Sequence, residues 1–143
     1  MHVSNPLLIL FLSLSCLMAT VGCETVPPLP QLEWKPVPIT DPAQAAGKWE
    51  GILRREPPSR TDDFVTIIIV TDGRFRFTSV KTIGVLSGEG TFTIADGGLT
   101  ITDERGSINM TLYEGDGQRM LRAKARSHDG IEYHSDLTPS GAR

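Results

Sequence analysis

Few residues in this 143-residue chain are of the types that carry out chemistry, and their spacing assembles no catalytic group. After Cys23 there is no further cysteine, and His128 and His134 are the remaining imidazoles. Neither histidine has a serine or cysteine nucleophile placed with it, as covalent catalysis requires. A metal pair would need Asp129 or Asp136 as an additional ligand, and an exposed turn and a solvated strand face explain the two histidines more simply. We therefore predict no enzyme activity, no metal site and no cofactor.

Six of the seventeen acidic residues lie in short polar segments that are typical of turns, where an Asp side chain bonds the turn backbone. These residues are Asp72, Asp96, Asp103, Glu114, Asp116 and Asp129. The glycine-rich segments lie between predicted strands rather than before a helix, so a phosphate-binding loop is not supported. Fourteen basic residues stand against seventeen acidic ones, a formal charge of -3 without a large block of either sign. This balance predicts no nucleic-acid partner.

Cys23 follows a segment with the features of an export signal. The run Leu7–Val21 holds fifteen uncharged residues, which matches a signal-peptide core and falls short of the ~20 residues of a membrane span. Thr20 and Gly22 place small side chains at positions -3 and -1 before the cysteine, as a signal peptidase needs. We expect residues 1–22 to be a signal peptide that is cleaved before Cys23.

This leader resembles a bacterial lipoprotein signal peptide, with Gly22-Cys23 as the matching core. The resemblance implies a diacylglycerol on the sulfur of Cys23 and a protein anchored in the cell envelope. Glu24, rather than Asp, follows the cysteine, and this implies the outer membrane, facing the periplasm. An ordinary cleaved secretion signal and an uncleaved short anchor are the alternatives, and all three export the chain.

Prolines recur after the cysteine and predict an extended spacer. Proline fixes φ, removes a backbone donor and keeps the preceding residue extended, as in a polyproline-type segment. We expect residues 23–40 to be a lipid-anchored tether. Asp41 is then a suitable cap for one short helical turn over Pro42–Ala46, with Gly47 at its exit.

From Lys48 onward the hydrophobic period is two, and turn signals recur at roughly ten-residue intervals. They read TDG, SGEG, ADGG, DERG, EGDG and HDG. This pattern predicts an antiparallel meander over residues 41–138, followed by a short tail, 139–143. A twisted sheet of that length removes its edges by closing. The predicted fold class is therefore all-β, a small antiparallel up-and-down barrel of about eight strands, with one short N-terminal helical turn.

Turn lengths set the register of the hairpins. The loop Glu114–Gly117 predicts Met110 opposite Leu121 and Ile108 opposite Ala123. In the last hairpin a three-residue loop, His128–Gly130, keeps apolar residues on one face and opposite charges on the other. Its predicted pairs are Arg126 with Glu132, Arg122 with Asp136, Lys124 with His134, Ala125 with Tyr133, Ala123 with Ser135 and Leu121 with Leu137. The segment Thr66–Val70 is apolar on both faces, so we expect its outer face to pack on the proline-rich segment or on Trp34.

The opening Gly47-Lys48-Trp49 of the first long strand, directly after a helical turn, resembles the GxW opening of lipocalin-like barrels. The resemblance covers this strand alone and implies that Trp49 plugs the closed end of the barrel.

Small side chains gather on one wall if the first strand closes against the last strands. The space beside them is then open to a ligand, or it is filled by Trp49 and Phe75, as in many eight-stranded barrels. The candidate ligand-binding residues are Trp49, Gly51, Phe75, Ala123, Ala125, Tyr133 and Ser135.

Two functions remain open at this point. One is a non-enzymatic envelope lipoprotein that binds a small apolar ligand or an envelope protein. The other is an exported inhibitor of a peptidase or lysozyme, with its contact in Arg55–Asp63 or Gln31–Thr40. The sequence leaves the oligomeric state open.

Overall fold

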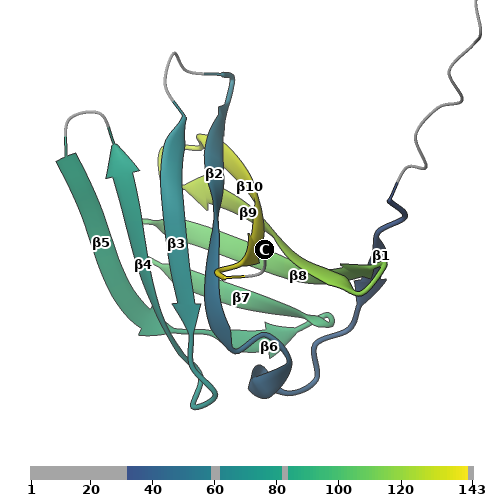
Figure 1. The fold of residues 1–143 in the computed structure, drawn as a ribbon. Coiled ribbons are helices and arrows are strands. Elements are labelled where there is room, and N and C mark those ends of the chain that lie inside the picture. Colours follow the sequence, from purple (N-terminus) through teal and green to yellow (C-terminus); the bar gives the residue numbers. More distant parts are fainter. Residues whose placement is uncertain (1–31, 59–61, 82–83, 142–143) are drawn as a thin grey trace, which may run out of the picture. The chain divides into compact units, whose positions relative to one another are not determined.

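A computed structural model describes residues 32–58, 62–81 and 84–141, and within these ranges the chain is an all-β protein (Figure 1). The predicted signal peptide, Cys23 and the tether up to residue 31 lie outside the described residues. No helix in the described ranges is long and apolar enough to cross a membrane.

The described residues form ten strands, more than the predicted eight, and one three-residue 3₁₀ turn, Pro42–Gln44. The strands are β1 (Lys35–Val37), β2 (Gly47–Glu56), β3 (Asp63–Ile69), β4 (Arg74–Lys81), β5 (Gly84–Thr91), β6 (Thr93–Ala95), β7 (Gly98–Asp103), β8 (Gly106–Gly115), β9 (Gln118–Ser127) and β10 (Glu132–Pro139). All pairings are antiparallel, in the order β5-β4-β3-β2-β10-β9-β8-β7-β6, and β1 pairs with the end of β8.

The sheet curves into a nearly closed barrel (Figure 1). Its two end strands, β5 and β6, are separated in the chain by Phe92 alone, and no ladder joins them in the described part. Phe92 is buried, and its backbone N–H donates to the carbonyl of Gly73 in the β3–β4 turn at 2.9 Å. The chain therefore turns a corner at Phe92, from one end of the sheet to the other.

The predicted turn at SGEG is wrong, because these residues lie inside β5. Gly88 pairs with Phe77 of β4 and Gly90 pairs with Phe75. A Cβ atom on Gly88 would overlap the Phe77 ring, and one on Gly90 would lie 3.1 Å from Cε1 of Phe75. The glycines therefore make room for aromatic rings on the neighbouring strand.

The folded body also begins earlier than the predicted boundary at Asp41. β1 comes from the expected tether and pairs with Leu112–Glu114 of β8. Its proline is tolerated because β1 is an edge strand, whose outer side needs no donor. After it, Ile39 is buried in the core and donates its N–H to the carbonyl of Gly97 at 2.8 Å.

The β8–β9 register differs from the prediction by two residues. Asp116 and Gly117 have φ angles of 47° and 74°, as in a two-residue type I′ turn, and Gly115 pairs with Gln118. Met110 consequently faces Ala123 rather than Leu121, and Ile108 faces Ala125 rather than Ala123. A shift of two residues keeps every side chain on its predicted face, because the side-chain period of a strand is two.

The predicted register of the last hairpin is confirmed for all six pairs between β9 and β10. Gly130 has a φ of 84°, as the three-residue loop requires. On the outer face the guanidinium of Arg122 binds Asp136 with two hydrogen bonds, of 2.7 and 3.1 Å. Asp136 accepts both of them, and this partner lowers the pKa of its carboxyl.

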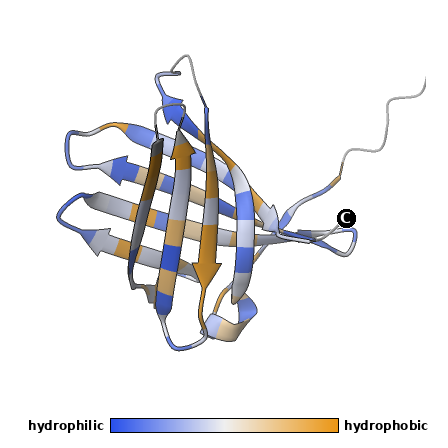
Figure 2. Ribbon diagram, turned by 60° about the vertical axis from the view of Figure 1, so that its left-hand side comes forward, coloured by the Kyte–Doolittle hydropathy of each residue, from blue (hydrophilic) through white to orange (hydrophobic). Residues whose placement is uncertain are grey.

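The outer face of β3 is not covered by Trp34, contrary to the prediction. Ile68 and Val70 are each 38% exposed, and Figure 2 shows the run of hydrophobic residues along β3. Trp34 lies instead near Gly115, where an added Cβ would be 3.5 Å from Cε3 of the indole. The reason is that β1 joins β8, and β2, β10 and β9 separate β8 from β3 in the sheet.

Substitutions on the two faces of the last hairpin should lower the free energy of unfolding by unequal amounts. Glu132→Lys changes an exposed position opposite Arg126, so we expect a loss of about 0.2 to 1 kcal/mol in the free energy of unfolding. Tyr133→Asp places a carboxylate beside Ala125 inside the barrel and should cost several times more. Urea unfolding followed by circular dichroism measures both, and the reverse order of the two losses would contradict the assigned faces.

Candidate functional site

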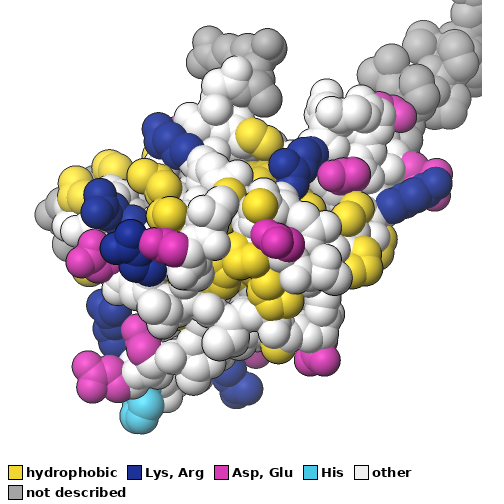
Figure 3. All heavy atoms as spheres, turned by 90° about the horizontal axis from the view of Figure 1, so that it is seen from below, with side chains coloured by type: hydrophobic (Ala, Val, Ile, Leu, Met, Phe, Trp, Pro, Cys, Tyr) yellow, Lys and Arg dark blue, Asp and Glu magenta, His cyan; other side chains and the backbone are white. Residues whose placement is uncertain are grey.

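One end of the barrel is sealed by Trp49 at the start of β2. The indole is 2% exposed, and its Nε1–H donates to the carbonyl of Ala45 at 2.8 Å. Ile39 and Ala45, from the segment that precedes β2, are buried in the same core. Figure 3 views the molecule from below, with hydrophobic side chains gathered toward its middle and charged ones mostly around them. This end forms a floor.

Arg119 of β9, the second strand from β2 in the sheet, also contacts the floor. Its guanidinium carbon lies 5.7 Å from the centroid of the Trp49 ring, within cation–π range. Its Nη2 also donates to the carbonyl of Gln44, and its Nε lies 3.4 Å from a carboxylate oxygen of Glu114. Gln44 is itself positioned by a capping box, in which its side chain accepts the N–H of Asp41 at 2.9 Å. Two separate parts of the chain, the 3₁₀ segment and β9, therefore fix the indole.

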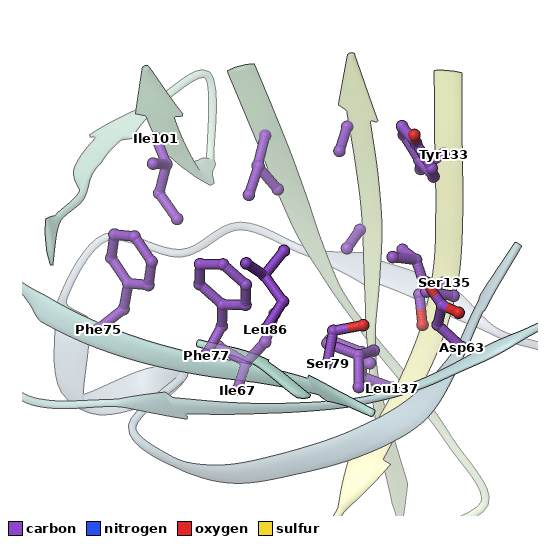
Figure 4. A pocket seen from close by; sticks show the side chains of 15 residues that line it. Asp63, Ile67, Phe75, Phe77, Ser79, Leu86, Ile101, Tyr133, Ser135 and Leu137 are labelled. Atoms are coloured by element: carbon purple, nitrogen blue, oxygen red, sulfur yellow. The ribbon is translucent and has the colours of Figure 1, made fainter. Parts of the chain in front are cut away.

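Above this floor the barrel encloses a cavity of about 260 Å³ (Figure 4). Its wall consists of inward-facing residues of β2 to β5 and of β7 to β10. They are Leu53, Asp63, Val65, Ile67, Phe75, Phe77, Ser79, Leu86, Ile101, Ile108, Ala123, Ala125, Tyr133, Ser135 and Leu137. The lining is mostly aliphatic and aromatic, as in pockets for apolar small molecules.

The polar groups of the cavity are few. Ser79 is 3% exposed and Ser135 is 1% exposed, and neither hydroxyl has a hydrogen-bond partner among the described residues. Asp63 is the single carboxylate in the lining, and it has an interaction partner in the folded chain. No lysine, arginine or histidine of the described part lines this cavity.

The cavity continues toward the side of the barrel. A second hollow of about 210 Å³ shares Phe75, Phe77 and Leu86 with it and extends to the β7–β8 turn at Arg105. Leu86, on the end strand β5, is 50% exposed. The interior therefore reaches the surface between β5 and the β7–β8 hairpin, on the side where the sheet does not close.

Five of the seven predicted site residues line the cavity: Phe75, Ala123, Ala125, Tyr133 and Ser135. Trp49 lies in the floor rather than in the wall. Gly51 does not line the cavity, because β10 passes close against it. A Cβ atom at Gly51 would overlap the carbonyl oxygen of Asp136 and approach Cδ2 of Leu137 to 3.0 Å.

Sequence reasoning missed most of the wall that β3, β4 and β5 contribute. The alternation in RFRFTSV contained a usable signal, because it puts Phe75, Phe77 and Ser79 on one face of β4. The contribution of Leu86 was hidden, because it depends on SGEG being strand rather than turn.

The other candidate sites do not assemble in the described residues. His128 and His134 are exposed, and no group of three or more His, Cys, Asp or Glu residues in these ranges could hold a metal ion. Of the two segments considered for inhibitor contacts, Gln31–Thr40 contains β1 and the buried Ile39. The loop Arg55–Asp63 falls partly outside the described residues.

Comparison with known proteins supports the architecture alone. No family model matches the chain, and no curated protein matches it. Among solved structures it is similar to a redesigned β-barrel, with a TM-score of 0.50 and 10% sequence identity, over 70% of this chain and 95% of that one. At this identity the similarity shows the fold, a nearly closed antiparallel β-barrel.

The floor predicts an unequal effect of replacing the two tryptophans. Trp49→Phe removes the hydrogen bond to Ala45 and part of the buried ring, so we expect the free energy of unfolding to fall by about 1 to 3 kcal/mol. Trp34→Phe, the matched control at a partly exposed site, should change it by less than about 0.5 kcal/mol. Chemical denaturation measures both variants, and equal losses would argue against the proposed role of Trp49.

Proposed function

We propose that this protein is a non-enzymatic binding protein of the bacterial cell envelope, which takes a small apolar ligand into its barrel and is anchored by lipid on Cys23. The observation that carries the binding role is the apolar cavity of about 260 Å³ above the Trp49 floor. A barrel of this kind is often filled by its own side chains. Here Phe75 stands in the wall and Trp49 in the floor, so the space between them is left for a ligand.

The size of the cavity bounds the size of the ligand. An apolar cavity of about 150 Å³ is enough to bind benzene. By simple proportion, 260 Å³ takes a molecule of about ten non-hydrogen atoms. A bicyclic aromatic or a short-chain compound meets this limit, and a long-chain lipid does not fit within it.

The architecture of the floor favours a lipocalin-like barrel as the finer class. Gly47-Lys48-Trp49 opens β2 directly after the 3₁₀ turn, and Trp49 is buried in the floor. This is the position that the resemblance to lipocalin-like barrels implies for the tryptophan.

The lipid anchor and the outer-membrane location rest on the leader sequence. An uncharged run of fifteen residues precedes Gly22-Cys23, and prolines follow the cysteine before β1. A lipid on Cys23 would hold the barrel at the membrane, and the folded barrel would supply the ligand site.

Binding is tested with a small fluorophore, 1-aminonaphthalene, whose emission rises in an apolar site. We expect saturable binding by the wild-type barrel. Ala123→Leu fills part of the cavity and should weaken binding at least about tenfold, because the probe and the added atoms compete for the same space. Lys124→Leu, on the outer face of the same strand, is the matched control and should bind as the wild type does. Absence of saturable binding to the folded wild type would refute the proposal.

Lipid anchoring is tested in cells that export the full chain. Cys23→Ser should release the protein from the membrane fraction, because each buried CH₂ of the acyl chains contributes about 0.8 kcal/mol to the free energy of membrane binding. The variant should also lack the mass of the lipid. Cys16→Ser, within the predicted signal peptide, should change neither property. Unchanged membrane association and mass in the Cys23 variant would rule out the anchor while leaving the binding role intact.

A further inference from the structure

We propose that the ligand is an uncharged molecule that carries one hydrogen-bonding group, a hydroxyl or a carbonyl, which binds between Ser79 and Ser135 while its apolar part lies against Phe75, Phe77 and Ile101. This inference rests on the proposed function, since it names the chemistry of a ligand for the same cavity. It goes beyond apolar binding because it predicts which apolar molecules the barrel prefers.

The two serines are buried in apolar surroundings that do not satisfy them. Ser79 of β4 lies between Val65 and Leu86 in the sheet, and Ser135 of β10 lies opposite Ala123. Both side-chain oxygens lack a hydrogen-bond partner among the described residues. Burying an unpaired hydroxyl is unfavourable, and most buried polar side-chain atoms are bonded. A ligand group that bonds to these hydroxyls removes that cost.

The arrangement of the lining separates a polar side from an apolar side. Figure 4 shows Ser79, Ser135 and Asp63 on the right of the cavity, and Phe75, Phe77 and Ile101 on the left. A molecule that enters between them has the serines at one end and carbon surfaces at the other; the two hydroxyl oxygens are buried in the empty barrel, so each serine side chain has to rotate to bond the ligand. The cavity therefore suits a ligand with a single polar end.

The charge of the lining excludes a strongly ionic ligand. An anion placed between the two serines would be buried without a lysine, arginine or histidine from the described lining of this cavity, because Arg105 and Arg126 line only the adjoining hollow. A cation would have Asp63 as its counter-ion, but that residue already has an interaction partner in the folded chain. A neutral donor or acceptor group needs no counter-ion, and a serine hydroxyl both donates and accepts.

The test compares four probes, naphthalene, 2-naphthol, benzoate and benzylammonium, and uses neutral benzamide and benzyl alcohol as controls of the same size as the two charged probes. Each is titrated at pH 7 against the wild type, Ser79→Ala, Ser135→Ala and the control Ser87→Ala, using probe fluorescence or calorimetry. Ser87 lies on β5 and is exposed, so its hydroxyl does not contact the ligand.

We expect the wild type to bind naphthalene and 2-naphthol, and to bind each charged probe at least about tenfold more weakly than its neutral control of the same size. Ser79→Ala and Ser135→Ala should each weaken 2-naphthol by about three- to tenfold, the range of one hydrogen bond, without weakening naphthalene. Ser87→Ala should alter neither. Without ligand, the two cavity variants should be at least as stable as the wild type, because each removes an unpaired buried hydroxyl.

The outcomes separate this inference from the function on which it rests. If naphthalene and 2-naphthol both bind but the serine variants weaken them equally or not at all, the polar site is refuted and the apolar binding role stands. Tighter binding of either charged probe than of its neutral control would also overturn the inference. If none of the four probes binds the folded wild type, the binding role is refuted and this inference with it.

Discussion

The floor built on Trp49 is the constraint on which the rest of the barrel interior depends. The indole joins the segment before it, its own strand β2 and, through Arg119, strand β9. The hydrogen bond from its Nε1 to Ala45 and the cation above its ring at Arg119 orient it from two directions. Arg119 in turn reaches the 3₁₀ turn through the carbonyl of Gln44. Because the Trp49 side chain closes this end of the barrel, the cavity above it is left unfilled.

On the side of the barrel, the packing of two aromatic rings on β5 and the missing pairing of β5 with β6 determine the structure. Phe75 and Phe77 pack over Gly90 and Gly88 of the end strand β5, which leaves little room for larger residues there. The rings also form part of the cavity wall. Because β5 does not pair with β6, the same strand that supports the aromatic wall borders the opening toward the β7–β8 turn. Wall and opening are thus consequences of one local arrangement.

The cavity departs from the rules of stable packing. A well-packed core fills its space and pairs its buried polar groups. This interior keeps an apolar space and two serine hydroxyls without partners among the described residues. Each such group costs about 1 to 3 kcal/mol when left unsatisfied. Departures of this kind concentrate at functional sites, while the outer-face pair of Arg122 and Asp136 follows the ordinary rules.

The sequence by itself determined the features that depend on neighbours along the chain. Alternation and turn residues were sufficient for the all-β class and for the register of the β9–β10 hairpin, because its short loop with Gly130 joins the two strands directly. They also placed Ala123, Ala125, Tyr133 and Ser135 on the inner face of this hairpin.

Only the tertiary structure decided what depends on distant residues. SGEG is a strand because Phe75 and Phe77 of another strand cover its glycines, and a proline-containing segment becomes β1 because the end of β8 offers it an edge. That Ser79 and Ser135 lack partners is likewise invisible in the sequence. Whether a hydroxyl is satisfied depends on every group around it in space, and strands from both halves of the chain supply those groups.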